Sequence, residues 1–249
     1  MKYVEFGNKQ AEVIMLLHGG GLSWWNYREA ARLLMDDYLV IVPVLDGHGG
    51  SDRPFTTIED NAAELISFID EHFGGHIGFI GGLSLGGQVL LEMLAQRSDI
   101  CRYALVESAA VIPARVTNAL IGPSFAASYP LIRNRSFAKL QFASLHMKKD
   151  LFEDYYRDSC LIQKEDLIAF MKASTSYQLR KEVALTAARV WIITGERETG
   201  EIRRSAQLIR ETIPGSQLEI MPGLCHGEFS LNHPDQYADK IRGILNGDQ

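Results

Sequence analysis

Two kinds of hydrophobic pattern alternate along most of the chain. Short runs in which almost every residue is apolar predict strands buried on both faces, and longer stretches in which apolar residues recur every three or four positions predict amphipathic helices. The predicted strands span residues 13–17, 39–44, 77–80, 103–106 and 190–193, with an edge strand at 217–221. The predicted helices span residues 25–35, 57–72, 87–96, 202–212 and 234–245. Strand alternating with helix predicts an α/β fold with a doubly wound, mostly parallel sheet.

The alternation breaks once, between residues 112 and 185, where no apolar strand occurs over a stretch far longer than an ordinary loop. Aromatic residues recur there at roughly helical spacings, and the prolines of this stretch, Pro113, Pro123 and Pro130, stand near its beginning. We therefore expect a helical cap at about 112–185, inserted after the fourth predicted core strand. Because no repeat or linker interrupts the chain, residues 1–249 are expected to form a single domain that includes the cap.

Composition narrows the possible partners. A chain of 249 residues, 46% of them hydrophobic, can bury one substantial core. The formal net charge of -6 and the isoelectric point near 5.7 oppose binding to nucleic acid, which needs a basic face. The apolar run at 13–17 is too short for a signal-peptide core or a membrane span, so we expect a soluble cytoplasmic protein with no membrane partner. The cysteines at 101, 160 and 225 are odd in number and widely spaced, which indicates neither a disulfide framework nor a metal site.

A glycine-rich turn joins the predicted strand at 77–80 to the next predicted helix. Residues 81–87 read GGLSLGG, which contains the pattern G-x-S-x-G centred on Ser84. A sharp turn of this kind forces the serine into strained backbone angles, so Gly82 and Gly86 are needed where neighbouring segments approach closely. The hydroxyl is then presented at the amino terminus of a helix, whose dipole favours developing negative charge. The strand, turn and helix together predict that Ser84 is a catalytic nucleophile.

A serine hydroxyl needs a general base with a pKa near neutrality, and histidine is the natural choice. Of the seven histidines, His226 is placed best, because it follows the last predicted strand and should lie at the carboxyl edge of the sheet. His72 and His76 are four residues apart, but the glycine pair at 74–75 interrupts the helix that would place them on one face. We therefore predict His226 as the base and no metal site.

The base in turn needs an acid that holds its tautomer and stabilises the imidazolium. The loop after the strand at 190–193 carries Glu198, which we predict to be this acid. Glu196 in the same loop and Glu107 after the strand at 103–106 are alternatives of the same chemical type.

Backbone amides must be aimed at the oxygen on which negative charge develops. Residues 18–21 read HGGG and follow the first predicted core strand. The N–H groups of Gly20 and Leu85 are the predicted oxyanion hole, with Gly21 as the alternative to Gly20. A phosphate-binding loop is disfavoured because neither G-K-[ST] nor G-x-G-x-x-G occurs at this turn.

These motifs resemble the α/β-hydrolase superfamily over about residues 13–245. The chain order of nucleophile, acid and histidine in that family matches Ser84, Glu198 and His226. The loop at 46–52, DGHGGSD, is also similar to a loop that is structural in the family. One departure concerns the acid, because small capped members of the family usually carry Asp where this chain has Glu198.

The resemblance implies a serine hydrolase that cleaves carboxylic esters of small or medium acyl groups through an acyl-enzyme and needs no cofactor. A C–C bond hydrolase or an acyltransferase would use the same Ser84 and His226, and is the alternative within the enzymes. A non-catalytic ligand-binding protein on the same fold is the alternative from another class. The expected partner is a small-molecule ester, and the sequence does not specify an oligomeric state.

Overall fold

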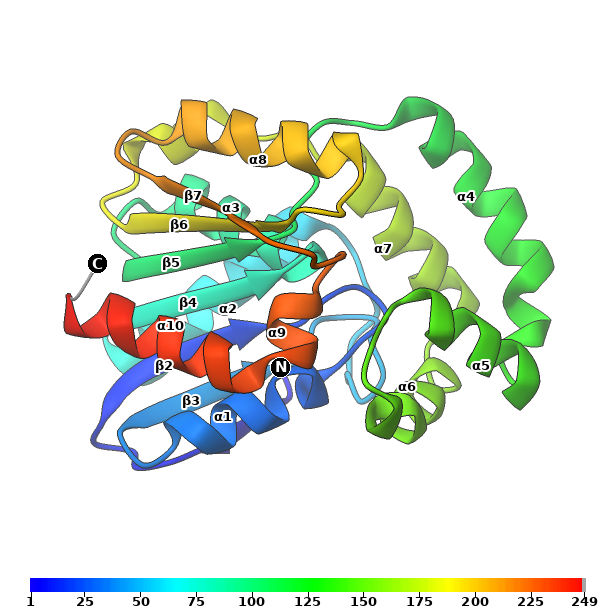
Figure 1. Ribbon diagram of the computed structural model, residues 1–249, viewed down its shortest axis with the longest axis horizontal. Helices are drawn as coiled ribbons and strands as arrows, with labels where there is room; N and C mark the ends of the chain where they lie inside the picture. Colours follow the sequence, from blue (N-terminus) through cyan, green and yellow to red (C-terminus); the bar gives the residue numbers. More distant parts are fainter. Residues whose placement is uncertain (248–249) are drawn as a thin grey trace.

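A seven-stranded sheet forms the centre of the computed structural model, which describes residues 1–247 (Figure 1). Its spatial order is β1-β3-β2-β4-β5-β6-β7. Strand β1 runs antiparallel to β3, and the other neighbouring pairs are parallel. The strands are β1 (Tyr3–Phe6), β2 (Glu12–Leu17), β3 (Tyr38–Pro43), β4 (Ile77–Leu83), β5 (Cys101–Glu107), β6 (Arg189–Gly195) and β7 (Gln217–Met221). The predicted α/β class and mostly parallel sheet are confirmed.

The strands read as continuous apolar runs because helices cover both faces of the sheet. Successive side chains of a strand point to opposite faces. Leu39 and Ile41 of β3 accordingly pack in one buried cluster with α2 (Ile58–Phe73), while Val40 and Val42 pack in the other with α1 (Arg28–Leu34). The remaining helices that flank the sheet are α3 (Leu85–Gln96) and α8 (Gly200–Thr212) on the α2 side, and α9 (Glu228–Asn232) and α10 (Pro234–Asn246) on the α1 side.

Parallel register brings the ends of several strands to one edge of the sheet. Leu17 of β2 lies opposite Gly82 of β4, Leu83 opposite Glu107 of β5, and Glu107 opposite Ile193 of β6. The loops that follow β2, β4, β5 and β6 therefore begin close together, which is where this class of sheet binds its ligands.

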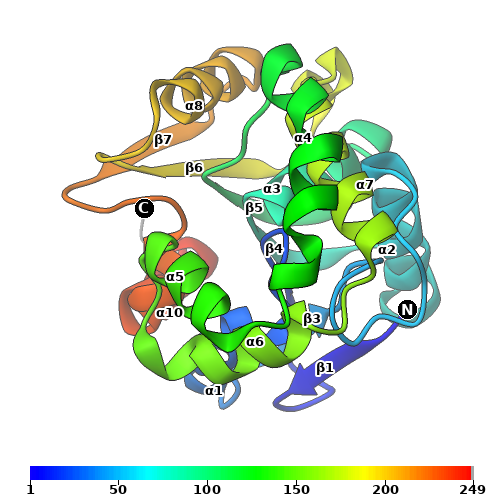
Figure 2. The same ribbon diagram turned by 90° about the vertical axis from the view of Figure 1, so that its right-hand side faces the viewer.

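Four α-helices occupy the stretch between β5 and β6. They lie beyond the arrowheads of the strands in Figure 1 and face the viewer in Figure 2. They are α4 (Arg115–Ser128), α5 (Arg135–Ser144), α6 (Phe152–Ser159) and α7 (Lys164–Ser176), with short 3-10 turns η2 (Tyr129–Leu131), η3 (Lys149–Leu151) and η4 (Lys181–Leu185) between or after them. The helical character of the stretch matches the expectation, although Pro123 lies inside α4. The interpretation as a cap within a single domain stays a prediction.

Two elements were not predicted. Strand β1 is short and half exposed, so it lacks the apolar run that marks the central strands. Helix α9 has five residues, too few to show a helical period. Another short 3-10 turn, η1 (Trp24–Tyr27), leads into α1. Within the part of the chain described here, no helix is long and apolar enough to cross a membrane.

Candidate active site

Ser84 occupies a strained turn between β4 and α3. Its backbone angles are φ 51° and ψ -110°, outside the regions that non-glycine residues normally adopt. The turn is tight enough that a Cβ atom on Gly82 would lie 2.4 Å from the carbonyl oxygen of Gly86, and one on Gly86 would lie 2.1 Å from that of Leu17. The Ser84 N–H donates to the carbonyl oxygen of Glu107 over 2.8 Å, which ties the turn to β5. The two glycines are thus required sterically, as the sequence predicted.

The structure brings Ser84, His226 and Glu198 into one hydrogen-bonded chain. Nε2 of His226 lies 3.1 Å from Oγ of Ser84, and Nδ1 lies 3.0 Å from Oε2 of Glu198. A carboxylate can only accept, so Nδ1 carries the proton in the neutral imidazole and Nε2 is left to accept from the serine hydroxyl. This is the relative arrangement that a serine nucleophile, its base and an orienting acid require.

Burial and charge act in opposite directions on His226. Desolvation lowers its pKa, but the hydrogen bond to Glu198 and the charges of Glu198 and Glu107 raise the pKa by more, so the net shift is upward. The imidazole side chain is 48% exposed, whereas that of Glu198 is only 1% exposed. The imidazole is therefore accessible from outside, while the carboxylate is shielded from water.

Ser108, which the sequence analysis did not single out, holds the acid in place. Its hydroxyl donates to Oε1 of Glu198, the carboxylate oxygen that does not face His226. Ser108 has φ 54° and its N–H donates to the carbonyl of Ile193 over 2.9 Å, which fixes it between β5 and β6. Its position two residues after the strand predicted at 103–106, next to Glu107, was the available sequence signal.

The two alternative acids have other partners. Oε2 of Glu196 accepts the Gly223 N–H over 2.8 Å, so this side chain braces the loop that carries His226. Glu107 is buried, and its Oε1 accepts the Ser230 N–H over 3.2 Å. Burial raises the pKa of Glu107 to about 7 against the opposing effect of that hydrogen bond. Among the three glutamates, Glu198 is the one hydrogen-bonded to the imidazole.

The predicted oxyanion loop is fixed by a neutral histidine. Nε2 of His18 accepts the Leu45 N–H over 3.1 Å, so Nδ1 carries the proton and donates to the Gly19 carbonyl over 2.9 Å. Burial and the nearby His48 lower the pKa of His18 to about 3, which keeps this tautomer neutral. In a trans peptide the carbonyl and the next N–H point in opposite directions, so the Gly20 N–H points away from His18.

Two neighbouring cavities with shared lining residues lie at the candidate site, and Ser84 lines the smaller one. The smaller, of about 80 Å³, is lined by Gly20, Ser84 and His226 together with Leu145 and Met147. The larger, of about 200 Å³, shares Gly20, Leu22 and Leu145 with it and extends among the helices between β5 and β6. Its other lining residues are Gly21, Phe125, Ile132, Gln141, Tyr155, Ser159, Ile162, Leu167, Phe170 and Met171. No Asp, Glu, Lys or Arg side chain lines either cavity within residues 1–247, so the space suits an uncharged apolar group.

Within residues 1–247, no cluster of three or more His, Cys, Asp or Glu side chains is arranged to hold a metal ion. Helix α2 ends at Phe73, before the Gly74 cap at φ 68°, so His76 lies outside the helix that carries His72. The ring nitrogens Nδ1 of these histidines lie near separate backbone carbonyls, those of Phe68 and Asp99.

Comparisons with known proteins identify the family and the fold. The sequence profile described as "Alpha/beta hydrolase family" matches residues 14–240. Lipase 1 of Psychrobacter immobilis is 23% identical over 98% of this chain and 80% of its own length, and a soluble epoxide hydrolase of Corynebacterium sp. (strain C12) is 25% identical over 81% and 71%. An esterase from Exiguobacterium antarcticum has a similar solved structure, with a TM-score of 0.82 at 18% identity over 98% of this chain and 94% of that one.

The profile covers most of the chain, including every residue of the hydrogen-bonded chain from Ser84 to His226. The family profile and the lipase relative support a hydrolase, and the likeness to the esterase structure supports the fold. The chain belongs to the alpha/beta hydrolase family.

Proposed function

We propose that this protein is a serine hydrolase that cleaves carboxylic esters of small or medium acyl groups. The observation that carries the proposal is the hydrogen-bonded chain from Ser84 through His226 to Glu198, at 3.1 and 3.0 Å. It lies at the carboxyl edge of the sheet and opens into an apolar cavity.

Acylation begins when Oγ of Ser84 attacks the ester carbonyl and its proton passes to Nε2 of His226. The tetrahedral intermediate collapses as Nε2 returns that proton to the leaving alkoxide, which departs as an alcohol. Water then attacks the acyl-enzyme, again giving a proton to His226, and the carboxylic acid leaves as Ser84 regains its hydrogen. Glu198 stays ionised throughout and stabilises the imidazolium. Each step uses only groups of this chain and water, so the proposed reaction needs no cofactor.

The oxyanion is assigned to the N–H groups of Gly20 and Leu85. Leu85 begins α3 directly after Ser84, and the Cβ position of Gly20 is 3.6 Å from Cβ of Leu85. The hydrogen bond from His18 to Gly19 turns the Gly20 N–H away from His18. Gly20 rather than Gly21 lines both cavities, which favours it over the alternative. Amides held in this way are already aimed before charge develops.

The apolar lining supports an acyl chain as the group bound in the larger cavity. A C–C bond hydrolase or an acyltransferase would use the same serine and histidine, but no further observation favours either. A non-catalytic binding protein has no need for a histidine that is hydrogen-bonded to both a serine and a shielded carboxylate.

The test is labelling and hydrolysis by wild type and by Ser84→Ala. A fluorophosphonate should label wild type stoichiometrically at Ser84, and a short-chain nitrophenyl ester should be hydrolysed. Ser84→Ala should lower kcat by about 10⁴- to 10⁶-fold, because the triad acts as a unit, while its thermal unfolding stays cooperative. Half of the wild-type activity remaining in Ser84→Ala, or no labelling of a folded wild type, would refute the assignment.

A further inference from the structure

Charge is distributed very unevenly over this acidic chain. Residues 108–149 contain six Lys and Arg and no Asp or Glu, whereas the other 207 residues carry 19 Lys and Arg against 31 Asp and Glu. The six cations are Arg115, Arg133, Arg135, Lys139, Lys148 and Lys149. They lie on α4, on α5 and next to these helices, at the right of Figure 1. The molecule therefore has a strong charge asymmetry, with its cationic end beyond the carboxyl edge of the sheet.

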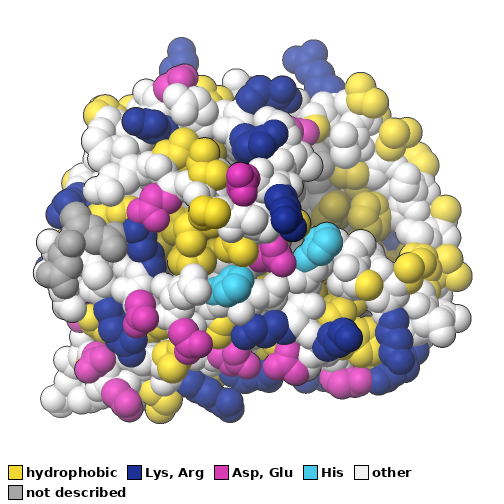
Figure 3. Space-filling model, viewed as in Figure 1, with side chains coloured by type: hydrophobic (Ala, Val, Ile, Leu, Met, Phe, Trp, Pro, Cys, Tyr) yellow, Lys and Arg dark blue, Asp and Glu magenta, His cyan; other side chains and the backbone are white. Residues whose placement is uncertain are grey.

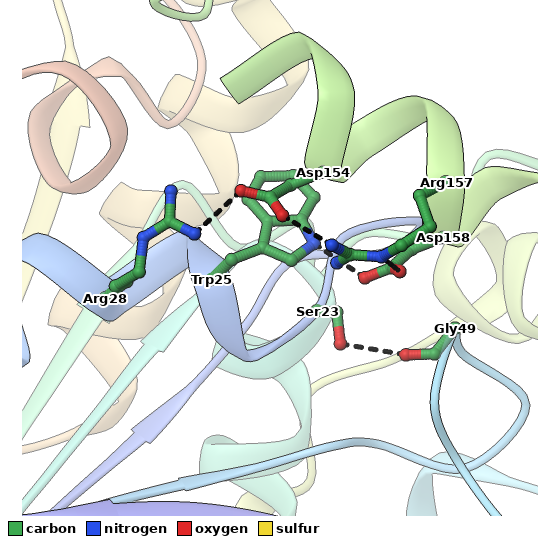
Figure 4. A network of polar contacts seen from close by, with 7 residues as sticks. All are labelled: Ser23, Trp25, Arg28, Gly49, Asp154, Arg157 and Asp158. Atoms are coloured by element: carbon green, nitrogen blue, oxygen red, sulfur yellow. Dashed lines mark hydrogen bonds and ion pairs between the residues drawn. The ribbon is translucent and has the colours of Figure 1, made fainter. Parts of the chain in front are cut away.

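Two of the three carboxylates of the neighbouring helix α6, Asp154 and Asp158, are directed toward the body of the molecule, and the third, Glu153, pairs with Arg135. Asp154 accepts from Arg28 over 2.8 Å and from Arg157 over 2.7 Å (Figure 4). Asp158 is buried and accepts from the indole of Trp25 over 2.8 Å and from Arg157 over 2.7 Å. These contacts neutralise the two carboxylates against α1 and η1, so they do not offset the cations of α4 and α5.

Most of the cations are available to an outside partner. Arg135 pairs with Glu153, and Lys148 lies 3.6 Å from Glu29. The other four, Arg115, Arg133, Lys139 and Lys149, are exposed and form no ion pair with a carboxylate of residues 1–247.

Large apolar side chains are exposed among these cations. Val116 and Leu120 of α4 are 78% and 59% exposed, and Leu140 of α5 is 73% exposed. Leu131 and Leu145 are also exposed. Figure 3 shows hydrophobic side chains gathered over the region of α4 and α5, around a hollow. A single exposed leucine is unremarkable, but several beside unpaired cations indicate a binding surface. We call these five apolar residues and the four available cations the outer cationic surface.

This surface adjoins the entrance to the candidate active site. Leu145 belongs to it and lines both cavities next to Ser84. Met147 lines the cavity at Ser84 and also a groove of about 460 Å³ whose rim carries Lys139 and Lys149. A partner held at the outer cationic surface would thus lie beside the route to Ser84.

We propose that the outer cationic surface binds an anionic lipid surface and presents the mouth of the site to it. Each lysine or arginine side chain near such a surface raises the affinity of the protein for the membrane by about fivefold. Apolar side chains add to this by inserting between the headgroups. The leucines favour lipid over nucleic acid, which would use the charges alone. The delivery of amphiphilic esters from the lipid to Ser84 rests on the proposed function, whereas the binding itself does not. The sequence predicted no membrane partner because no apolar run was long enough to span a membrane. Binding at the membrane surface does not require such a run.

The test is co-sedimentation of the 249-residue protein with two kinds of vesicle. One kind is pure phosphatidylcholine, and the other is phosphatidylcholine with about 30% phosphatidylglycerol. Ser84→Ala is used for binding, so that lipid hydrolysis does not interfere. We expect binding to the anionic vesicles at least tenfold tighter than to the neutral ones, falling with added salt. The double variant Arg133→Glu/Lys139→Glu should lose at least tenfold of that affinity, and Leu120→Ser/Leu140→Ser should weaken binding at unchanged charge.

The matched control is Arg32→Glu/Arg210→Glu, which reverses two charges on α1 and α8. This variant should bind the anionic vesicles nearly as tightly as the parent protein does. Hydrolysis of a water-soluble ester by Arg133→Glu/Lys139→Glu, in the background with Ser84 intact, should stay near wild type. Equal loss in the control pair would overturn the proposal, as would the absence of binding to anionic vesicles. An oligonucleotide that binds as tightly as the vesicles would assign the surface to polyanions instead. A wild-type dimer that Leu140→Ser dissociates would assign it to a second copy of the chain.

Discussion

At the scale of single residues, the loop after β6 places two glutamates close together with different tasks. Glu198 accepts from Nδ1 of His226 and from the Ser108 hydroxyl, while Glu196 accepts from the Gly223 backbone. A one-methylene difference from aspartate is accommodated because Ser108, at a positive φ, meets the far oxygen of the longer side chain. The position of the Glu198 carboxylate is therefore fixed by partners in the segments that follow β5 and β7.

Glu198→Gln should lower kcat by up to about 10⁴-fold, because the amide favours the wrong tautomer of His226. Removing the carboxylate charge should also lower the pKa of His226, which Glu198 raises. The acid limb of the kcat/KM profile of any residual activity should accordingly move to lower pH. Steady-state kinetics from pH 5 to 9 measure both effects.

Glu196→Gln is the matched control, because the amide oxygen can still accept the Gly223 N–H. This variant should lower kcat by less than about tenfold. Glu107→Gln should also lower kcat much less than Glu198→Gln does, because Glu107 has no hydrogen bond to the imidazole within residues 1–247. A large loss confined to Glu107→Gln would move the acid to β5.

The sequence predicted individual site residues as far as local patterns extend. Ser84 stands in a turn whose geometry follows from its own glycines, so the local sequence of strand, turn and helix was enough to predict its role. The choice among Glu198, Glu196 and Glu107 depended on side-chain directions over loops, which no local period encodes. Ser108 was missed for the same reason, since its contact with Glu198 spans 90 positions of sequence.

At the scale of elements, the helices between β5 and β6 line most of the larger cavity. Phe125 comes from α4, Gln141 from α5, Tyr155 from α6, and Phe170 from α7. Phe170 stacks on His48 at a ring-centroid distance of 4.3 Å, so this wall is joined to the loop after β3. The depth of the cavity thus depends on how helices from this one stretch pack together.

Phe125→Ala should shift the preference toward longer acyl chains, because it removes a ring from the wall of the cavity. We expect the ratio of kcat/KM for octanoyl over butanoyl esters to rise by about ten- to a hundredfold. Phe137→Ala is the matched control: Phe137 is a partly buried aromatic residue of α5 that does not line the cavity. If both variants shifted the ratio equally, or if neither shifted it, this wall would not determine the preference for acyl-chain length.

Elements were predicted from the sequence in proportion to their burial. The five central strands were found because both faces are covered, which leaves a continuous apolar run. Strand β1 has a half-exposed pattern and is held by its register with β3, a contact across more than 30 residues. Periodicity within one segment carries no signal of such pairing, so an edge strand of four residues escaped prediction.

At the scale of the whole molecule, a buried carboxyl behind the site makes stability depend on pH. Oε2 of Glu107 is buried and has no hydrogen-bond partner within residues 1–247, and burial raises the pKa of this group to about 7. In the unfolded chain the pKa is near its ordinary value of 4.5. Between these two values the folded protein binds more protons than the unfolded chain, so the free energy of unfolding falls as pH rises.

Glu107→Gln should therefore stabilise the protein at pH 8 relative to wild type, by on the order of 1–3 kcal/mol, and this gain should shrink toward zero at pH 4.5. The amide keeps an oxygen that can accept the Ser230 N–H, so the variant changes charge more than shape. The pKa of His226 is also raised, so this residue contributes stability below its ordinary value of 6.5 that is lost as pH rises through the folded pKa, in the same direction as Glu107. Comparison with Glu107→Gln in the His226→Ala background separates the two groups. Urea unfolding at pH 4.5, 6 and 8 measures the difference, and an equal shift at all three values would mean that Glu107 acts through packing and not through its charge.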